Sequence, residues 1–326
     1  QTNLSILSKG ERLCALSVIK RMAHEVVPAL SPEGRFPSTS SIASAVFRAA
    51  LVAHWNHLKQ PLSDYLNTLE ALFSSVGSSW YDLYFHQEGQ LNPIYLPCIR
   101  DIAADKVPAA DHDLFTALCS LDGDFLYQEG LQAAAIQEYT RSQVLPTDEQ
   151  LRPAREALNN LYKAASTLGI QRPSSYLAVL SMDGDHMGRV QFADANAHRA
   201  FSQDLADFAQ NSVRRVVELD RSGRVIYAGG DDVLALLPAE DALNAAEELR
   251  TKFASRFRER GLHVSVGIAY VHRTYPLQAA IREAKAAQDR AKKEFQRNAI
   301  AVALLQRSGE PLHMGMRWEA ADPETK

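Results

Sequence analysis

Cysteine is scarce in this chain of 326 residues, which contains only three cysteines. Cys14, Cys98 and Cys119 are far apart and form no C-x-x-C pair, so neither a zinc ribbon nor a disulfide framework is expected. The sequence also lacks an apolar run of about 18 residues, which a membrane-spanning helix requires, and it lacks the charged-then-apolar pattern of a signal peptide. We therefore expect a soluble cytoplasmic protein with reduced thiols and no membrane association.

An excess of basic residues is absent as well. The chain has 35 Lys and Arg against 39 Asp and Glu, for a net charge of −4 at pH 7. This balance argues against binding nucleic acid through bulk positive charge, although it leaves room for a local basic groove. A hydrophobic content of 46% and a charged content of 23% are ordinary for a globular protein, and the length suits about two domains.

The first 170 residues are predicted to be mainly helical. A capping-box pattern begins a helix over 8–27, and a second helix follows Pro37 and extends to His54. Irregular structure is expected over 89–106 and over 146–153.

A short helix is then predicted over 158–168, and the polar, proline-containing residues 171–173 mark a domain boundary. We expect a helical domain over 1–170, a palm domain over 171–312, and the start of a truncated C-terminal segment over 313–326.

The pattern after residue 173 changes to a regular alternation of strands and helices. The order β-α-β-β-α-β, followed by one more helix and strand, is that of a ferredoxin-like palm, so the expected fold class is α+β. The predicted strands cover 176–182, 224–228, 233–237, 263–270 and 299–305, with helices near 201–216, 242–257 and 277–295.

Two acidic clusters lie at the ends of predicted strands. Gly229-Gly230-Asp231-Asp232 separates two short apolar runs and predicts a hairpin with adjacent carboxylates at its tip. Asp183-Gly184-Asp185 ends the strand that begins this half of the chain. In the predicted topology these two strands are neighbours, so Asp183 and the hairpin aspartates are expected to meet at one edge.

Carboxylates that stay ionised at close range need a counter-charge, usually a divalent metal ion. We predict that Asp183, Asp231 and Asp232 are catalytic residues and hold two Mg²⁺ or Mn²⁺ ions about 3.5–4 Å apart. Such ions activate an attacking ribose hydroxyl and neutralise a triphosphate. The pattern therefore indicates a nucleotidyl transferase or nucleotide cyclase with ATP or another nucleoside triphosphate as its substrate.

Further residues are predicted to contact the nucleotide. Backbone N–H groups of a loop before a helix suit phosphate, and glycines let a ligand approach the backbone closely. Ser265 is a candidate contact for the base. A basic cluster at the end of the last long helix is a candidate contact for the triphosphate. The same cluster also suits an ordinary solvated helix end, and Ser265 also suits a core strand. The predicted set is Gly184, Asp185, His186, Met187, Gly188, Gly229, Gly230, Ser265, Lys292, Lys293 and Arg297.

Asp111-His112-Asp113 is similar to the metal-binding His–Asp pair of phosphohydrolases. Such a site needs further histidines on surrounding helices, and a polar loop is expected here. A nuclease site is therefore the less favoured interpretation.

The chain resembles the large signature subunit of type III CRISPR RNA-targeting complexes, the B subtype above all. The resemblance rests on the Asp183-Gly184-Asp185 and Gly229-Gly230-Asp231-Asp232 motifs together with their flanking strands. The matching segments are 9–16, 19–21, 36–39, 176–188, 227–236, 265–268, 297–299 and 307–310.

The resemblance implies a palm that condenses ATP into 3′–5′ cyclic oligoadenylate second messengers once target RNA is bound. It implies that Asp231 and Asp232 are the catalytic pair and that Asp183 is a metal ligand. It also implies partners, namely the other subunits of an RNA-guided effector complex, the guide RNA and the target RNA.

The sequence also departs from that family. The HD nuclease domain, the cysteines of the zinc motif and most of the C-terminal helical domain are missing. The expected lysine is Lys293 by its distance from Arg297 but Lys292 by the Ala-Lys dipeptide. Three alternatives remain: a stand-alone GGDEF-like cyclase, transfer of AMP to an acceptor such as S-adenosylmethionine, and a catalytically silent scaffold subunit.

Overall fold

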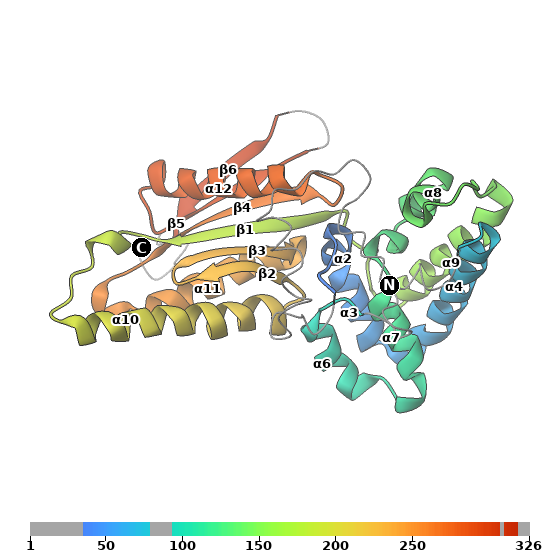
Figure 1. Cartoon of the computed structure of the whole chain (residues 1–326), viewed down its shortest axis with the longest axis horizontal. Coiled ribbons are helices and arrows are strands. Elements are labelled where there is room, and N and C mark those ends of the chain that lie inside the picture. The colour runs from blue at the N-terminus through green and yellow to red at the C-terminus, as the bar shows by residue number, and fades with distance from the viewer. Residues whose placement is uncertain (1–34, 79–92, 307–309, 319–326) are drawn as a thin grey trace, which may run out of the picture.

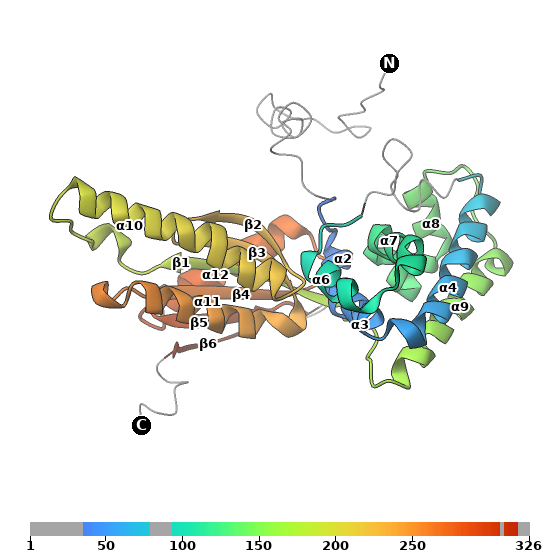
Figure 2. The ribbon, with the colours of Figure 1, turned by 90° about the horizontal axis from the view of Figure 1, so that it is seen from below.

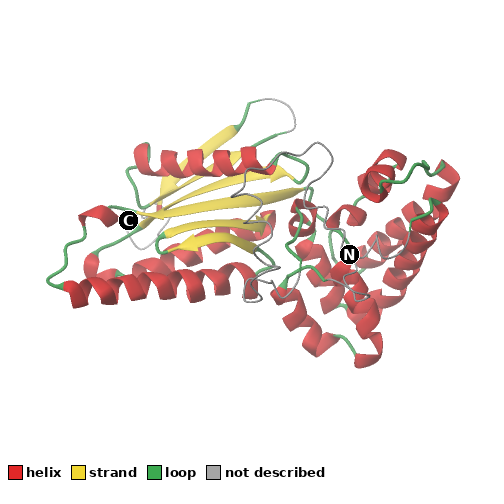
Figure 3. Cartoon of the chain, viewed as in Figure 1, coloured by secondary structure: helices red, strands yellow, loops and turns green. Residues whose placement is uncertain are grey.

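The computed structural model describes residues 35–78, 93–306 and 310–318. A lobe built of helices lies beside a second part in which helices cover a six-stranded sheet (Figures 1 and 3). This arrangement confirms the expected α+β class, with a helical region followed by a palm. The helix predicted over 8–27 lies outside the described residues. None of the described helices is long and apolar enough to cross a bilayer.

The helical lobe begins at the helix predicted after Pro37. Ser38 caps this helix by accepting a hydrogen bond from the backbone N–H of Ser41 at 3.1 Å. Leucines and aromatic residues from several helices then form one apolar core. The helices are α2 (Thr39–Ala43), α3 (Ala45–Ala53), α4 (Trp55–Ser75), α6 (Pro97–Lys106), α7 (His112–Ser120), α8 (Ala133–Thr140) and α9 (Asp148–Ser166).

Two segments predicted to be irregular are partly helical. Pro97 occupies the first turn of α6, where a missing N–H costs nothing, and α6 buries Ile99 and Ala103. Helix α9 begins at Asp148 because Thr147 and Gln150 form a capping box, with hydrogen bonds of 2.8 and 3.3 Å. The predictions of irregular structure were therefore wrong for 97–106 and 148–153, whereas 93–96 and 146–147 lie outside helices and 89–92 lie outside the described residues.

The palm sheet has the strand order β2-β3-β1-β4-β5-β6, in which only β4 and β5 run parallel. This order is the ferredoxin-like one with an added unit, as predicted. The helix after β1 continues beyond α10 in wider π-helical turns as far as Leu219. The elements are β1 (Tyr176–Gly184), α10 (Ala195–Asp207), β2 (Arg224–Gly229), β3 (Asp232–Pro238), α11 (Ala242–Arg256), β4 (Val264–His272), α12 (Leu277–Lys293), β5 (Ala299–Leu304) and β6 (Leu312–Arg317).

Strand β6 was not predicted. It pairs antiparallel with β5, from Leu304 opposite Leu312 to Ala299 opposite Arg317. The described part of the segment that was expected to follow the palm therefore completes the palm sheet.

The sheet is covered on both faces, with α12 on one face and α10 and α11 on the other (Figures 1 and 2). Along β1, Ala178, Leu180 and Met182 belong to the core under α10 and α11. Leu177 and Val179 belong to the core shared by α12 and the helical lobe. This period of two places Ser181 and Asp183 on the α12 face.

The helical lobe contacts the palm at the end of the sheet where β1 begins (Figure 1). The buried guanidinium of Arg273, which follows β4, pairs with Asp124 of the lobe and lies 4.0 Å from the ring centre of Tyr127. On the other side of the sheet, Arg224 at the start of β2 lies 4.3 Å from the ring centre of Tyr95. The acidic hairpin tip points away from this contact, at the opposite end of β2 and β3.

Candidate active site

The hairpin that carries the acidic pair has a two-residue turn. Gly229 pairs with Asp232 in the ladder, and Gly230 and Asp231 form the turn. Gly230 has a φ of 69°, a backbone conformation that glycine adopts without steric cost. Gly229 has a different role, because a Cβ there would lie 2.1 Å from the hydroxyl oxygen of Tyr227.

Strand register brings the end of β1 to this hairpin. Met182 pairs with Val233, so one further step in the register sets Asp183 opposite Asp232 on the α12 face. Side chains in such pairs have Cβ atoms about 4.5–5.5 Å apart. Asp231 lies over the next residue, since a Cβ on Gly184 would lie 2.5 Å from Asp231 Oδ2. The structure thus brings all three predicted carboxylates to one end of the sheet.

The charges at this end are only partly balanced. Burial raises the pKa of Asp232, the charge of Asp231 raises it further, and Lys285 opposes both. The ammonium group of Lys292 contacts Asp183 Oδ2 and lies 3.5 Å from the carbonyl oxygen of Gly184. Burial, followed by repulsion from Arg297, lowers the pKa of Lys292.

The structure distinguishes the two candidate lysines. Lys292 faces the acidic end, whereas Lys293 is exposed and lies 3.3 Å from Asp289 of the same helix. The prediction that Lys293 contacts the nucleotide is thus not supported by its position. Lys285 was missed, although it precedes Lys292 by seven residues, a spacing that places both on one helix face.

Asp185 and Ser265 form a buried structural pair. Ser265 Oγ donates to Asp185 Oδ1 and Oδ2 at 2.8 and 3.0 Å, and the backbone N–H of Asn298 donates to Oδ2 at 2.9 Å. Asp185 is 4% exposed and Ser265 0% exposed. The nucleotide contacts of these two side chains stay a prediction, and the polar atoms of both already form hydrogen bonds inside the protein.

This buried pair holds the connection between α12 and β5. Gln296, Arg297 and Asn298 have φ angles of 59°, 68° and 42°, a left-handed conformation that costs energy outside glycine. The hydrogen bond from Asn298 to Asp185 stabilises that conformation. As a result Arg297 lies close enough to Lys292 to influence its pKa.

The loop after β1 differs from the prediction. Met187–Arg189 forms a single 3₁₀ turn, and α10 begins only at Ala195, where Asp194 Oδ1 accepts from the N–H of Ala197 at 2.7 Å. No long helix thus starts at residues 184–188, so a helix dipole cannot support the predicted phosphate contacts. His186 and Gly188 are exposed, and Met187 packs against the apolar core.

The donor atoms at the acidic end suit Mg²⁺ or Mn²⁺, which prefer carboxylate oxygens. Asp183, Asp231 and Asp232 would hold the ions. Within the described ranges, no three Asp, Glu, His or Cys side chains are already gathered into a ligand cluster. Lys292 supplies the positive charge next to Asp183 instead, so a metal ion would have to replace Lys292 as the partner of Asp183.

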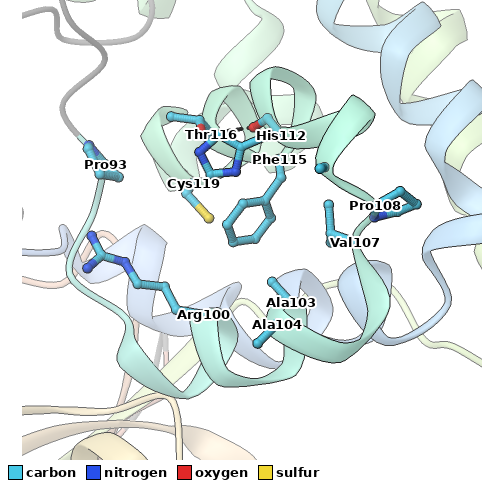
Figure 4. Close-up of a pocket in the computed structure, with 11 residues that line it drawn as sticks. Pro93, Arg100, Ala103, Ala104, Val107, Pro108, His112, Phe115, Thr116 and Cys119 are labelled. Carbon is cyan, nitrogen blue, oxygen red and sulfur yellow. Dashed lines mark hydrogen bonds between the residues drawn. The ribbon is translucent and has the colours of Figure 1, made fainter.

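A second region carries the His112 motif. His112 begins α7, rather than lying in a polar loop, and lines a cavity of about 480 Å³ between α6 and α7 (Figure 4). Asp111 Oδ2 accepts hydrogen bonds from Trp55 at 2.9 Å and Lys59 at 3.0 Å. Burial raises the pKa of the Cys119 thiol in this cavity to about 12. These contacts indicate a structural role, and no second histidine among the described residues lines the cavity.

Residues 176–301 match the protein family described as Cas10/Cmr2, second palm domain. This match and the relatives below support a Cas10-like large subunit of a type III CRISPR system. Over 231 residues it is 30% identical to the CRISPR system Cmr subunit Cmr2 of Pyrococcus furiosus, covering 61% of this chain and 26% of that protein. Over 150 residues it is 27% identical to the single-strand-specific deoxyribonuclease Cas10/Csm1 (subtype III-A) of Mycobacterium tuberculosis, covering 39% of this chain and 18% of that protein.

Among solved structures, the chain is similar to a Csm1–Csm4 cassette in complex with pppApA. The TM-score is 0.36 at 20% identity, and the similarity covers 42% of this chain and 21% of that one. The matched part of this chain thus spans about a quarter or less of these longer proteins.

We predict that Gly184→Ala disturbs the acidic end. The new methyl group would lie 2.5 Å from Asp231 Oδ2 and 2.6 Å from Met187 Cγ, so the free energy of unfolding should fall by about 1–3 kcal/mol. Urea unfolding measures this change. Gly188→Ala is the matched control, because nothing lies within 4 Å of its added Cβ, and its effect should stay within about 0.5 kcal/mol. Equal stability of the two variants would contradict the described packing of Asp231 on Gly184.

Proposed function

We propose that this palm joins ATP molecules into 3′–5′ cyclic oligoadenylates, within an RNA-guided type III CRISPR complex in the cytoplasm. The observation that carries the proposal is the convergence of Asp183, Asp231 and Asp232 at one sheet end of a Cas10/Cmr2 palm. Mg²⁺ or Mn²⁺ ions are the proposed cofactors, and ATP is the proposed substrate.

The chemistry follows from this arrangement. The 3′-hydroxyl of one nucleotide loses its proton and attacks the α-phosphorus of the next, a new P–O bond forms, and pyrophosphate leaves. Bound divalent ions would make the hydroxyl more acidic and neutralise the phosphates. Asp183 and Asp232 would hold those ions, and Asp231 would supply a further carboxylate from the turn. Lys292 and Arg297 place positive charge beside the leaving pyrophosphate.

One observation favours a catalytically silent scaffold as the second candidate. Lys292 already neutralises Asp183, as it would in a site that never binds metal. The scaffold, however, leaves the neighbouring Asp231 and Asp232 unexplained, since burial and mutual repulsion raise the pKa of Asp232 without a structural benefit. The remaining alternatives use the same site. Equal turnover of GTP would favour a GGDEF-like cyclase, and AMP attached to S-adenosylmethionine would identify a different acceptor.

We further propose that activity depends on partner subunits, guide RNA and target RNA. A net charge of −4 gives the chain little bulk attraction for RNA. The helical lobe lies at the end of the sheet away from the acidic tip. The long helix that begins with α10 extends along the sheet towards this lobe (Figure 1). The hydrogen bond from Arg214 of that helix to the Tyr95 hydroxyl, at 2.6 Å, connects it to the lobe. Partner contacts with the lobe would act on the site along this route.

We predict that replacing Asp231 and Asp232 together by alanine abolishes product formation. Both residues lie at a partly exposed tip, so their loss relieves repulsion and leaves the fold intact. The assembled complex is incubated with radiolabelled ATP, Mg²⁺ and target RNA, products are identified by mass spectrometry, and melting temperature serves as the folding control. Undiminished ATP consumption by the double variant would refute the proposed site.

Lys292 and Lys293 provide a matched pair of variants in the same assay. Lys292→Gln removes a charge at the acidic end and should lower the rate about 100-fold, a typical effect of losing one stabilising group. Lys293→Gln changes an exposed residue paired only along its own helix and should stay within about twofold. The assignment of Lys292 fails if the two variants lose activity equally or if only Lys293→Gln does.

A further inference from the structure

The outer strand of the palm sheet carries an exposed apolar stripe. Leu312, Met314 and Met316 of β6 are 50%, 61% and 42% exposed. They are two residues apart, so all three side chains lie on one face of the sheet. Their ladder partners on β5 include Ile300 and Val302, which belong to the α10 and α11 side. We name Leu312, Met314 and Met316 the β6 stripe.

The two faces of β6 differ in how they are covered. On the α12 face, a Cβ on Gly315 would lie 2.4 Å from the ring of Phe295, so that aromatic side chain packs directly on the strand. On the other face, α10 and α11 lie next to each other, α11 contacts β1 and β4, and β6 lies beyond α11. No helix of the described part of the chain lies over β6 on this side (Figure 2). A row of exposed apolar side chains on an uncovered strand indicates an interaction surface.

The uncovered strip has the dimensions of one α-helix. Packed helices lie about 8–10 Å apart and neighbouring strands about 4.8 Å apart, so one helix covers roughly two strands. The layer of α10 and α11 therefore ends one helix short of the sheet edge formed by β5 and β6. The six residues of β6 span about 20 Å, which corresponds to roughly 13 residues of helix. The flexible side chains of Met314 and Met316 suit the uneven surface of such a helix.

Carboxylates lie along the α11 side of this strip. Arg250 of α11 lies 5.9 Å from the ring centre of Trp318, which follows β6, so the helix face shared by Arg250 and Glu247 is turned towards the strip. Glu240 lies near the end closer to the helical lobe, where burial, and then the charge of Glu240, raises the pKa of Tyr270 to about 12. Both carboxylates are exposed. Lysine or arginine side chains on a docked helix would therefore find acidic partners along its α11 flank.

We propose that the β6 stripe is the docking surface for one basic amphipathic helix of a partner subunit. The apolar side of that helix packs on Leu312, Met314 and Met316, and its basic side chains pair with Glu240 and Glu247. A second copy of this chain fits less well, because it would bring the same acidic rim and a net charge of −4 to the contact. The inference rests on the proposed function only for its partner, which is taken from the same RNA-guided complex.

Photo-cross-linking in the purified effector complex tests the docking surface. The photoreactive residue p-benzoylphenylalanine replaces Met314 in the full chain, the complex is irradiated, and cross-linked peptides are identified by mass spectrometry. We expect a cross-link to a helical segment of another subunit that contains lysine or arginine. The same replacement at Ile226, an exposed apolar residue on the opposite edge strand β2, is the control and should not give this product. No cross-link, one to a non-helical or acidic segment, or one confined to copies of this chain would overturn the proposal.

Competition for the other subunits tests the energetics of docking. Equal amounts of wild-type and variant chain are mixed with those subunits, and mass spectrometry gives the ratio of the two chains in the assembled complex. Met314→Glu should be outcompeted at least about tenfold, because docking would bury an unpaired charge. Ile226→Glu should be incorporated as well as the wild-type chain. Equal incorporation of these two variants would refute the docking surface.

The acidic rim is tested in the same competition. Glu247→Lys should be outcompeted about threefold or more, because it places like charge against the basic helix. Glu259→Lys makes the same change at an exposed position after α11 and should have no effect. Melting temperatures equal to that of the wild-type chain show that all variants fold. Equal incorporation of both lysine variants would contradict a basic partner helix.

Neither measurement requires ATP turnover, so the docking surface and the proposed reaction can fail separately. A Met314 cross-link to another subunit in a complex that forms no cyclic oligoadenylate would support the docking surface and refute the reaction. Formation of that product in a complex without the cross-link would support the reaction and refute the docking surface.

Discussion

The register of the palm strands, fixed by their burial on both faces of the sheet, is the constraint on which the rest of the palm depends. The pairing of β1 with β3 sets Asp183 opposite Asp232, and the tight hairpin turn adds Asp231. Each of these placements follows from apolar strands whose register is fixed by burial on both faces. The buried strands therefore bring three carboxylates together where the strands leave the hydrophobic core. Positive charge from Lys285 and Lys292 on one face of α12 offsets part of their mutual repulsion.

The Asp-Gly-Asp motif combines two different carboxylates. Asp183 remains partly exposed on the α12 face, whereas Asp185 is buried and accepts hydrogen bonds from Ser265 and a backbone N–H. Gly184 between them has no side chain, which allows Asp231 to approach. The first carboxylate suits metal binding, and the second fixes the left-handed connection that places Arg297. This short motif thus combines a candidate metal ligand with a buried structural carboxylate.

Much of this could be predicted from the sequence. The palm strands and helices follow strong apolar periodicity, and the ferredoxin-like order then brings Asp183 to the hairpin. Helix α6 and the start of α9 were missed because Pro97 and Pro153 suggested irregular structure, whereas Pro97 lies in a first turn and the Thr147 capping box starts α9. The burial of Asp185 and Ser265 was not predictable, since it depends on Asn298 arriving from a distant loop. Likewise, only tertiary packing shows which of two adjacent lysines faces the site.

We propose that the acidic sheet end holds divalent metal ions. The most direct measurement is a titration of Mn²⁺ into the full chain, followed by electron paramagnetic resonance, in which the signal of free aqueous Mn²⁺ is lost on binding. We expect the wild-type chain to bind Mn²⁺, and we expect binding to weaken at least about tenfold in Asp183→Asn and in Asp232→Asn, since each variant removes a charged ligand. Asp289→Asn, an exposed change on α12, should leave binding unchanged. Equal Mn²⁺ binding by the wild-type chain and by both site variants would contradict metal binding at the acidic sheet end.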